Sequence, residues 1–96
     1  MRTGIEIEKK LAKAVEYLKS IGCKEIILFG SLSEEEFDES SDIDLAVSGI
    51  SPRTYFRAVA TLPSLVRWKV DLVTLDYSST QLKGRIQKRG RKLYVA

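Results

Sequence analysis

The sequence predicts a small α/β (α+β) domain with a mixed β-sheet and helices packed mainly on one face, in the order α-β-β-α-β-α. Apolar residues recur at helical spacing in three segments, whereas three shorter apolar runs have the length and turn-residue boundaries of strands. The first two strands follow each other directly, which excludes a strictly alternating, doubly wound sheet. The chain has 96 residues, so we expect one domain, residues 1–96.

The first half of the chain contains one helix and two strands. The helix is expected over residues 5–21, because apolar side chains share one face there and Gly22 follows as a C-cap. Residues 25–29 form the first strand, which ends at Gly30-Ser31. Residues 42–47 form the second strand, bounded by turn residues.

A second helix begins with Ser51 as N-cap and Pro52 at the first helical position, and we expect Pro63 to end it. Its expected core face consists of Tyr55, Phe56, Val59, Ala60 and Leu62.

The last third of the chain predicts a strand, a helix and an optional edge strand. Residues 69–75 form the third strand. A cap within residues 78–80 begins the last helix, which ends at Gly90, and residues 92–95 can add the edge strand. Asp76 is expected to cap the last helix.

Two aromatic residues flank the third strand. We expect Trp68 and Tyr77 to pack against the core rather than to stack on bases.

The composition excludes several classes of catalytic site. The chain has no histidine and one cysteine, Cys23, so Ser-His and Cys-His nucleophiles and thiolate metal clusters are excluded. Chemistry must depend on carboxylates, hydroxyls, Lys and Arg, backbone groups and a hard cation. No apolar run approaches the ~18 residues that cross a bilayer, and the N-terminus lacks a signal-peptide pattern. We therefore expect a cytoplasmic protein without membrane contact.

Charge is distributed unevenly along the chain. Residues 34–39 form an acidic run, and residues 83–92 are rich in Lys and Arg. The basic segment reads as a solvated helix face, with phosphate, RNA or an acidic protein as alternative partners.

Three aspartates are candidate metal ligands. Asp42 and Asp44 are two positions apart on a strand, so they share one face. Asp71 lies on the third strand and joins them if that strand neighbours the second. Close carboxylates repel unless a cation lies between them, and Mg²⁺ is held by carboxylates together with substrate phosphates. A lone Asp-x-Asp is more often a solvated strand face, but a third acid on an apolar strand favours one or two bound Mg²⁺ ions.

A glycine and a serine end the first strand, twelve residues before Asp42. Gly30 lets the backbone approach a phosphate closely, and Ser31 adds a hydroxyl donor. Alone, the pair is a common turn; followed by the two aspartates, it indicates a site for a nucleoside triphosphate.

Gly30-Ser31, the segment Ser41–Val47 with its two aspartates, and Val70–Val73 with Asp71 together resemble the DNA polymerase beta-like nucleotidyltransferase superfamily. Within it, residues 5–95 look like a minimal nucleotidyltransferase, the compact branch often paired with a HEPN-type helical protein. The resemblance implies the nucleotidyltransferase fold.

The resemblance also implies a mechanism and a partner. Asp42 and Asp44 would bind two Mg²⁺ ions, Asp71 would complete one of them, and Gly30 with Ser31 would hold the phosphates of ATP or another NTP. A nucleoside monophosphate would move to an acceptor hydroxyl, in an antitoxin-like case on the HEPN partner. We also expect association, which includes a homo-oligomer; RNA binding is a weaker alternative.

The segment after Gly30-Ser31 departs from the family pattern. Active relatives usually carry arginine and then glycine there, whereas this chain has Leu32, Ser33 and then glutamates. Ser33 to Glu36 fits a helix capping box. The acids also allow an alternative function: a catalytically weak or inactive binding module of the same fold that neutralises a helical partner.

Overall fold

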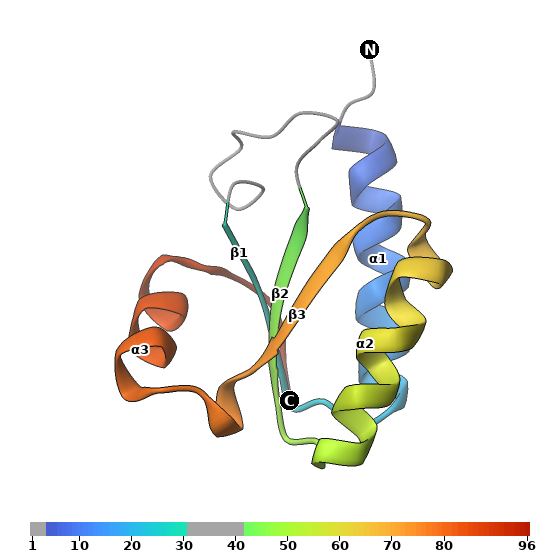
Figure 1. Cartoon of the computed structure of the whole chain (residues 1–96). Coiled ribbons are helices and arrows are strands. Elements are labelled where there is room, and N and C mark those ends of the chain that lie inside the picture. Colours follow the sequence, from blue (N-terminus) through green and yellow to red (C-terminus); the bar gives the residue numbers. More distant parts are fainter. Residues whose placement is uncertain (1–3, 31–41) are drawn as a thin grey trace.

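The computed structural model describes residues 4–30 and 42–96. Figure 1 shows its helices and strands. In chain order they are α1 (Gly4–Ser20), β1 (Glu25–Phe29), β2 (Ile43–Ser48), α2 (Pro52–Val66), β3 (Val70–Thr74), the 3-10 turn η1 (Leu75–Tyr77), α3 (Thr80–Arg89) and β4 (Arg91–Val95). The predicted order is confirmed, including the edge strand, and most boundaries differ from the prediction by one residue.

The four described strands form one mixed sheet in the order β3-β2-β1-β4. β1 pairs antiparallel with both β2 and β4. β2 and β3 are parallel because α2 carries the chain back across the sheet between them, as a parallel connection requires. The third strand therefore neighbours the second, which is the arrangement that brings Asp71 to Asp44.

Among the described residues, two helices cover one face of the sheet and one helix covers the other. α1 and α2 pack on one face, and α3 packs on the opposite face (Figure 1). Alternation along β2 explains the two cores: Ile43, Leu45 and Val47 belong to the α1/α2 core, whereas Ala46 belongs to the α3 core. Asp44 consequently lies on the α3 face, since it shares the alternation of Ala46.

The prediction that Pro63 ends the second helix is wrong. α2 continues through Pro63 to Val66 and ends at Arg67, which has a left-handed conformation. Proline removes one backbone donor, but the extra turn buries Val66, which is 2% exposed.

The continued turn also changes the core face of α2. The buried stripe follows the four-residue spacing Ala58, Leu62 and Val66. Phe56 is 68% exposed, and Val59 and Ala60 are also exposed, so the predicted place of these three residues in the core is wrong.

The structure corrects two further expectations. Ser79, not Asp76, caps α3, and its hydroxyl accepts a hydrogen bond from the Leu82 N–H. The Asp76 carboxylate instead accepts from the N–H of Gly49 at 2.9 Å, so it joins η1 to the turn before α2.

Tyr77 is 65% exposed and does not pack, whereas Trp68 packs against the main core as expected. No helix in the described ranges has the length and apolar character needed to span a bilayer.

Candidate active site

Asp44 and Asp71 lie side by side on the α3 face of the sheet. In the parallel pairing of β2 with β3, Asp44 is the register partner of Asp71. On the other side of Asp44, the antiparallel β1 places Phe29 opposite it. Neighbouring strands are about 4.8 Å apart, so the two carboxylates share one short row across the sheet.

The next row of the same face is covered by protein. It consists of Ile27, Ala46 and Val73. Leu75 and Ile86 pack over it and complete the small core under α3. The acidic row lies beside this core, so Asp44 is half-buried and Asp71 is exposed.

The pKa of the Asp44 carboxyl is raised above its usual value. Burial is the largest cause, and the negative charges of Asp71 and then Asp42 add to it. Asp42 is exposed and directly precedes β2. Both of the other predicted acids therefore act on Asp44, and their repulsion of its carboxylate is what a bound cation would remove.

Gly30 lies against Asp44 at the end of β1. Its φ is +78°, in the left-handed region that favours glycine. A Cβ at this position would overlap Asp44 Oδ2 and lie 3.0 Å from Asp44 Cγ. Only glycine leaves room for the carboxylate, so Gly30 fixes where Asp44 can lie. The sequence pointed to Gly30 for a phosphate, but this contact with Asp44 is visible only in the structure.

The remaining residues of interest either fall outside the described part of the chain or belong to α2 and α3. Ser31, the Ser33 to Glu36 capping box and the acidic run lie outside the described residues. Two arginines of the second helix, Arg53 and Arg57, lie on α2, which covers the opposite face of the sheet, so the structure does not bring them to the acidic row. The basic segment 83–92 starts in α3, on the same face as Asp44, and apart from Ile86 its helical side chains are exposed.

The donor set suits a divalent cation completed by a ligand. Within residues 4–30 and 42–96, no three His, Cys, Asp or Glu side chains are grouped closely enough to hold a metal ion. Mg²⁺, however, is usually held by one or two carboxylates plus phosphates and water. The adjacent pair Asp44 and Asp71, with Asp42 close enough to raise the pKa of Asp44, matches that requirement.

Comparison with known proteins identifies relatives across most of the chain. The family model "Polymerase beta, Nucleotidyltransferase" matches residues 9–96. A Methanocaldococcus jannaschii protein named "Putative protein adenylyltransferase MJ1217" is 36% identical over 78 residues, which are 77% of this chain and 80% of that protein.

Solved structures similar to this chain also cover most of its length. A crystal structure of a toxin-antitoxin with AMP-PNP superposes with a TM-score of 0.76 at 30% identity, over 93% of this chain and 73% of that one. A structure of a tri-AMPylated Shewanella oneidensis HEPN toxin in complex with an MNT antitoxin superposes with a TM-score of 0.65 at 25% identity, over 91% and 73% of the two chains.

Proposed function

This chain belongs to the polymerase beta nucleotidyltransferase family, as a domain of the minimal nucleotidyltransferase type, and on that premise we propose that it transfers AMP from ATP to a protein hydroxyl. The observation that carries the proposal is the in-register pair Asp44 and Asp71, which lies beside Gly30 and has Asp42 next to it. β2 and β3 present Asp44 and Asp71 on one face of the sheet, because the two residues are register partners in neighbouring parallel strands.

The proposed reaction is a single displacement at phosphorus. The acceptor hydroxyl oxygen attacks the α-phosphorus of ATP, the bond from that phosphorus to the oxygen bridging to the β-phosphate breaks, and pyrophosphate leaves. The hydroxyl proton passes to water. Mg²⁺ held by Asp42, Asp44 and Asp71 would neutralise phosphate charge and lower the pKa of the acceptor hydroxyl. Gly30 and Ser31 would hold the β- and γ-phosphates.

The proposed acceptor is a hydroxyl of a HEPN-type toxin that this chain neutralises as an antitoxin. The support comes from the similar structures, which include toxin-antitoxin complexes and a tri-AMPylated HEPN toxin.

The test is transfer of radiolabel from ATP to a HEPN-type partner in the presence of Mg²⁺. Label on the α-phosphate should become covalently attached, and label on the γ-phosphate should leave with pyrophosphate. Asp44→Asn and Asp71→Asn should each lower the rate by at least about 100-fold, because both remove charge from the reacting centre. The matched control is Glu16→Gln, which removes an exposed carboxylate on α1 and should leave the rate unchanged. Full transfer by Asp44→Asn would contradict the assignment.

The alternative is a binding module that neutralises the partner without catalysis. The acidic residues that replace arginine after Gly30-Ser31 favour it, because like charge opposes a triphosphate. Neutralisation that persists in Asp44→Asn, without transfer by the unmodified protein, would establish this second function.

A further inference from the structure

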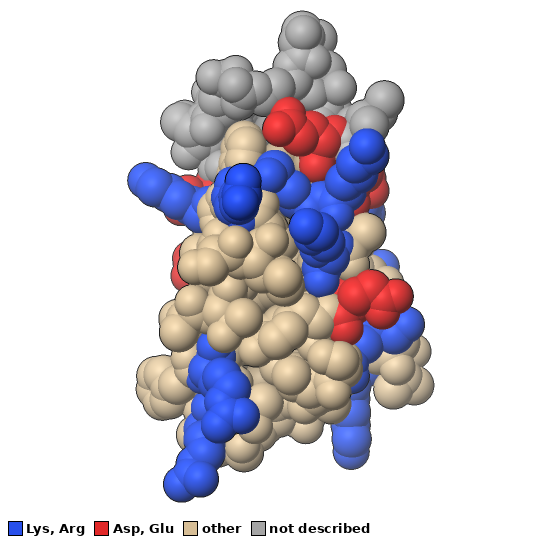
Figure 2. Space-filling view, turned by 90° about the vertical axis from the view of Figure 1, so that its right-hand side faces the viewer, with Lys and Arg blue, Asp and Glu red and all other residues tan. Residues whose placement is uncertain are grey.

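A hollow lies between α1 and α2, on the face of the molecule opposite α3. Its volume is about 280 Å³. Seven residues line it: Glu6, Lys9, Lys10, Lys13, Leu65, Val66 and Arg67. Figure 2 faces this side of the molecule and shows Lys and Arg side chains gathered over the upper part of the molecule, with Asp and Glu side chains beside them, above a broad uncharged region. The hollow therefore combines an apolar wall from α2 with a cationic wall from α1.

The charge around the hollow is not balanced by the fold. Glu6 is the single carboxylate among its lining residues. Within the described ranges, Lys9, Lys13 and Arg67 form no ion pair. The whole stretch from Ile50 to Val70, which contains α2, has no Asp or Glu. The nearby cations consequently have free capacity for a negatively charged ligand.

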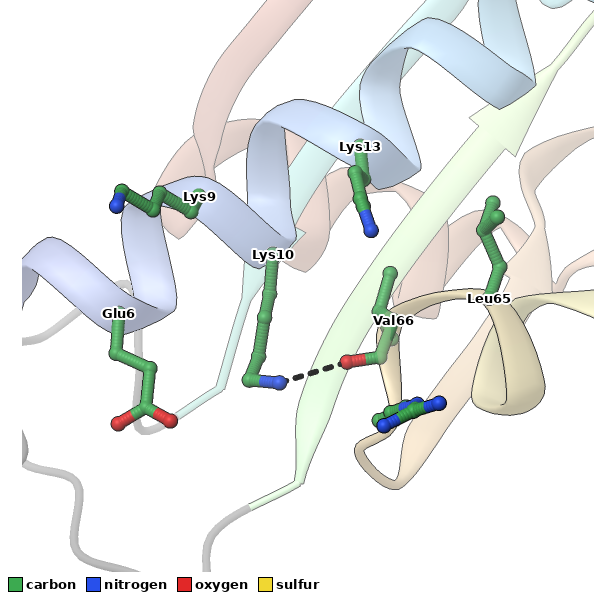
Figure 3. Close-up of a pocket in the computed structure, with 7 residues that line it drawn as sticks. Glu6, Lys9, Lys10, Lys13, Leu65 and Val66 are labelled. Carbon is green, nitrogen blue, oxygen red and sulfur yellow. Dashed lines mark hydrogen bonds between the residues drawn. The ribbon is translucent and has the colours of Figure 1, made fainter.

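One lining cation serves the fold itself. Lys10 donates from Nζ to the Val66 carbonyl at 2.8 Å (Figure 3). Its ammonium also lies 5.6 Å from the centre of the Trp68 ring. Lys10 thus satisfies a carbonyl of the last turn of α2 and joins the two helices. The cations available to a ligand are Lys9, Lys13 and Arg67.

Arg67 occupies a position where the backbone favours glycine. Its φ is 56° and ψ is 49°, and it is the single non-glycine residue with positive φ among those described. A side chain in this conformation costs about 1 kcal/mol relative to glycine. The chain nevertheless has an arginine at this position, where it lines the hollow.

We propose that this hollow binds a segment of a protein partner in which carboxylates flank an apolar side chain, as on one face of an acidic amphipathic helix. Leu65, 37% exposed, supplies the apolar contact, and the three cations pair with the carboxylates. Single-stranded RNA fits less well, because no aromatic ring lines the hollow for base stacking. The inference deepens the proposed partner role and rests on it.

The hollow is placed to bring a partner to the acidic row without blocking it. Arg67 lies four positions before Asp71, so the hollow and the carboxylate pair are at the same end of β3. They lie on opposite faces of the sheet, since α2 covers one face and Asp44 lies on the α3 face. A partner anchored in the hollow can extend around this end of the sheet and present a hydroxyl to Asp44 and Asp71.

The test is an NMR titration of the isotope-labelled chain with a helical peptide of about fifteen residues that carries Leu and Glu at four-residue spacing. The largest shifts of backbone amides should fall on Lys13, Leu65 and Arg67. Lys13→Glu should weaken binding about tenfold, since it replaces an attraction by a repulsion. Lys83→Glu on α3 makes the same change of charge and should alter the affinity by less than about twofold.

Three results would overturn the proposal: no shifts at millimolar peptide, an equal loss in Lys83→Glu, or tighter binding of an RNA of the same length. Arg67→Gly provides a second variant that cannot fail through strain, because glycine suits the backbone there; it should weaken binding while raising stability. Asp44→Asn should bind the peptide normally. Failure of AMP transfer together with normal peptide binding would therefore reject the proposed reaction and leave the docking site standing.

Discussion

Replacing Gly30 by alanine tests the contact that positions Asp44. The added Cβ would overlap Asp44 Oδ2 and lie 3.3 Å from Asp44 Cβ, so the carboxylate has to turn away. The backbone also has to keep φ at +78° with a side chain present. The backbone term costs about 1–2 kcal/mol, and moving the carboxylate off its rotamer adds about 1 kcal/mol. We expect Gly30→Ala to lower the free energy of unfolding by about 2–3 kcal/mol.

Gly22→Ala is the matched control for this change. Gly22 also has positive φ, +102°, but a Cβ there would meet nothing within 4 Å. Gly22→Ala should therefore lower the free energy of unfolding only by the cost of a side chain at positive φ, about 1–2 kcal/mol. The assay is urea unfolding followed by circular dichroism, with the midpoints compared at constant slope.

A double-mutant cycle isolates the contact itself. In an Asp44→Ala background, Gly30→Ala should cost about 1 kcal/mol less, because the carboxylate that it would displace is gone. Mg²⁺-dependent nucleotide binding should fall in Gly30→Ala and remain in Gly22→Ala. Equal costs for Gly30→Ala in both backgrounds, with nucleotide binding intact, would refute the reasoning.

Three further predictions concern the pH dependence of stability, a buried thiol and an edge hydrogen bond. Burial and neighbouring acids raise the pKa of Asp44 in the folded state, so stability is lost as pH rises through that pKa. Without metal at neutral pH, Asp44→Asn should have a higher melting temperature than the unmodified chain, and this difference should vanish in acid. Mg²⁺ should raise the melting temperature of the unmodified chain but not that of Asp44→Asn. Burial and then the charge of Asp76 raise the pKa of Cys23 to about 11, so a thiol reagent at neutral pH should label it slowly in the folded chain and rapidly in guanidinium. Rapid labelling of the folded chain would contradict its burial. Tyr55→Phe removes a hydroxyl that donates to the Leu72 carbonyl at 2.6 Å. In urea unfolding, this change should lower the free energy of unfolding by about 1 kcal/mol. No change would mean that water satisfies the carbonyl equally well.

Local patterns predicted the sheet and the acidic row correctly. Alternation along β2 places Asp44 on the opposite face from its apolar neighbours, and the same alternation in β3 does so for Asp71. Their pairing required β2 and β3 to be neighbours, which the helix between them made the natural topology.

The errors arose where distant contacts override local signals. Proline usually ends a helix, yet Val66 gains a buried position in the following turn. Aspartate is a residue type that often caps helices, and Asp76 lies just before α3. The carboxylate of Asp76 nevertheless accepts its hydrogen bond from the N–H of Gly49, 27 residues away in the sequence. The space that Gly30 provides for Asp44 is likewise invisible in sequence, because it depends on the pairing of β1 with β2.

The central claim is that the acidic row holds a metal-bound nucleoside triphosphate, and a calorimetric titration of ATP into the chain tests it most directly. We predict binding in Mg²⁺, loss of binding with a chelator, and loss in Asp44→Asn, with Glu16→Gln unchanged. Binding of equal strength in Asp44→Asn, or no binding of ATP with Mg²⁺ by the unmodified chain, would contradict the account.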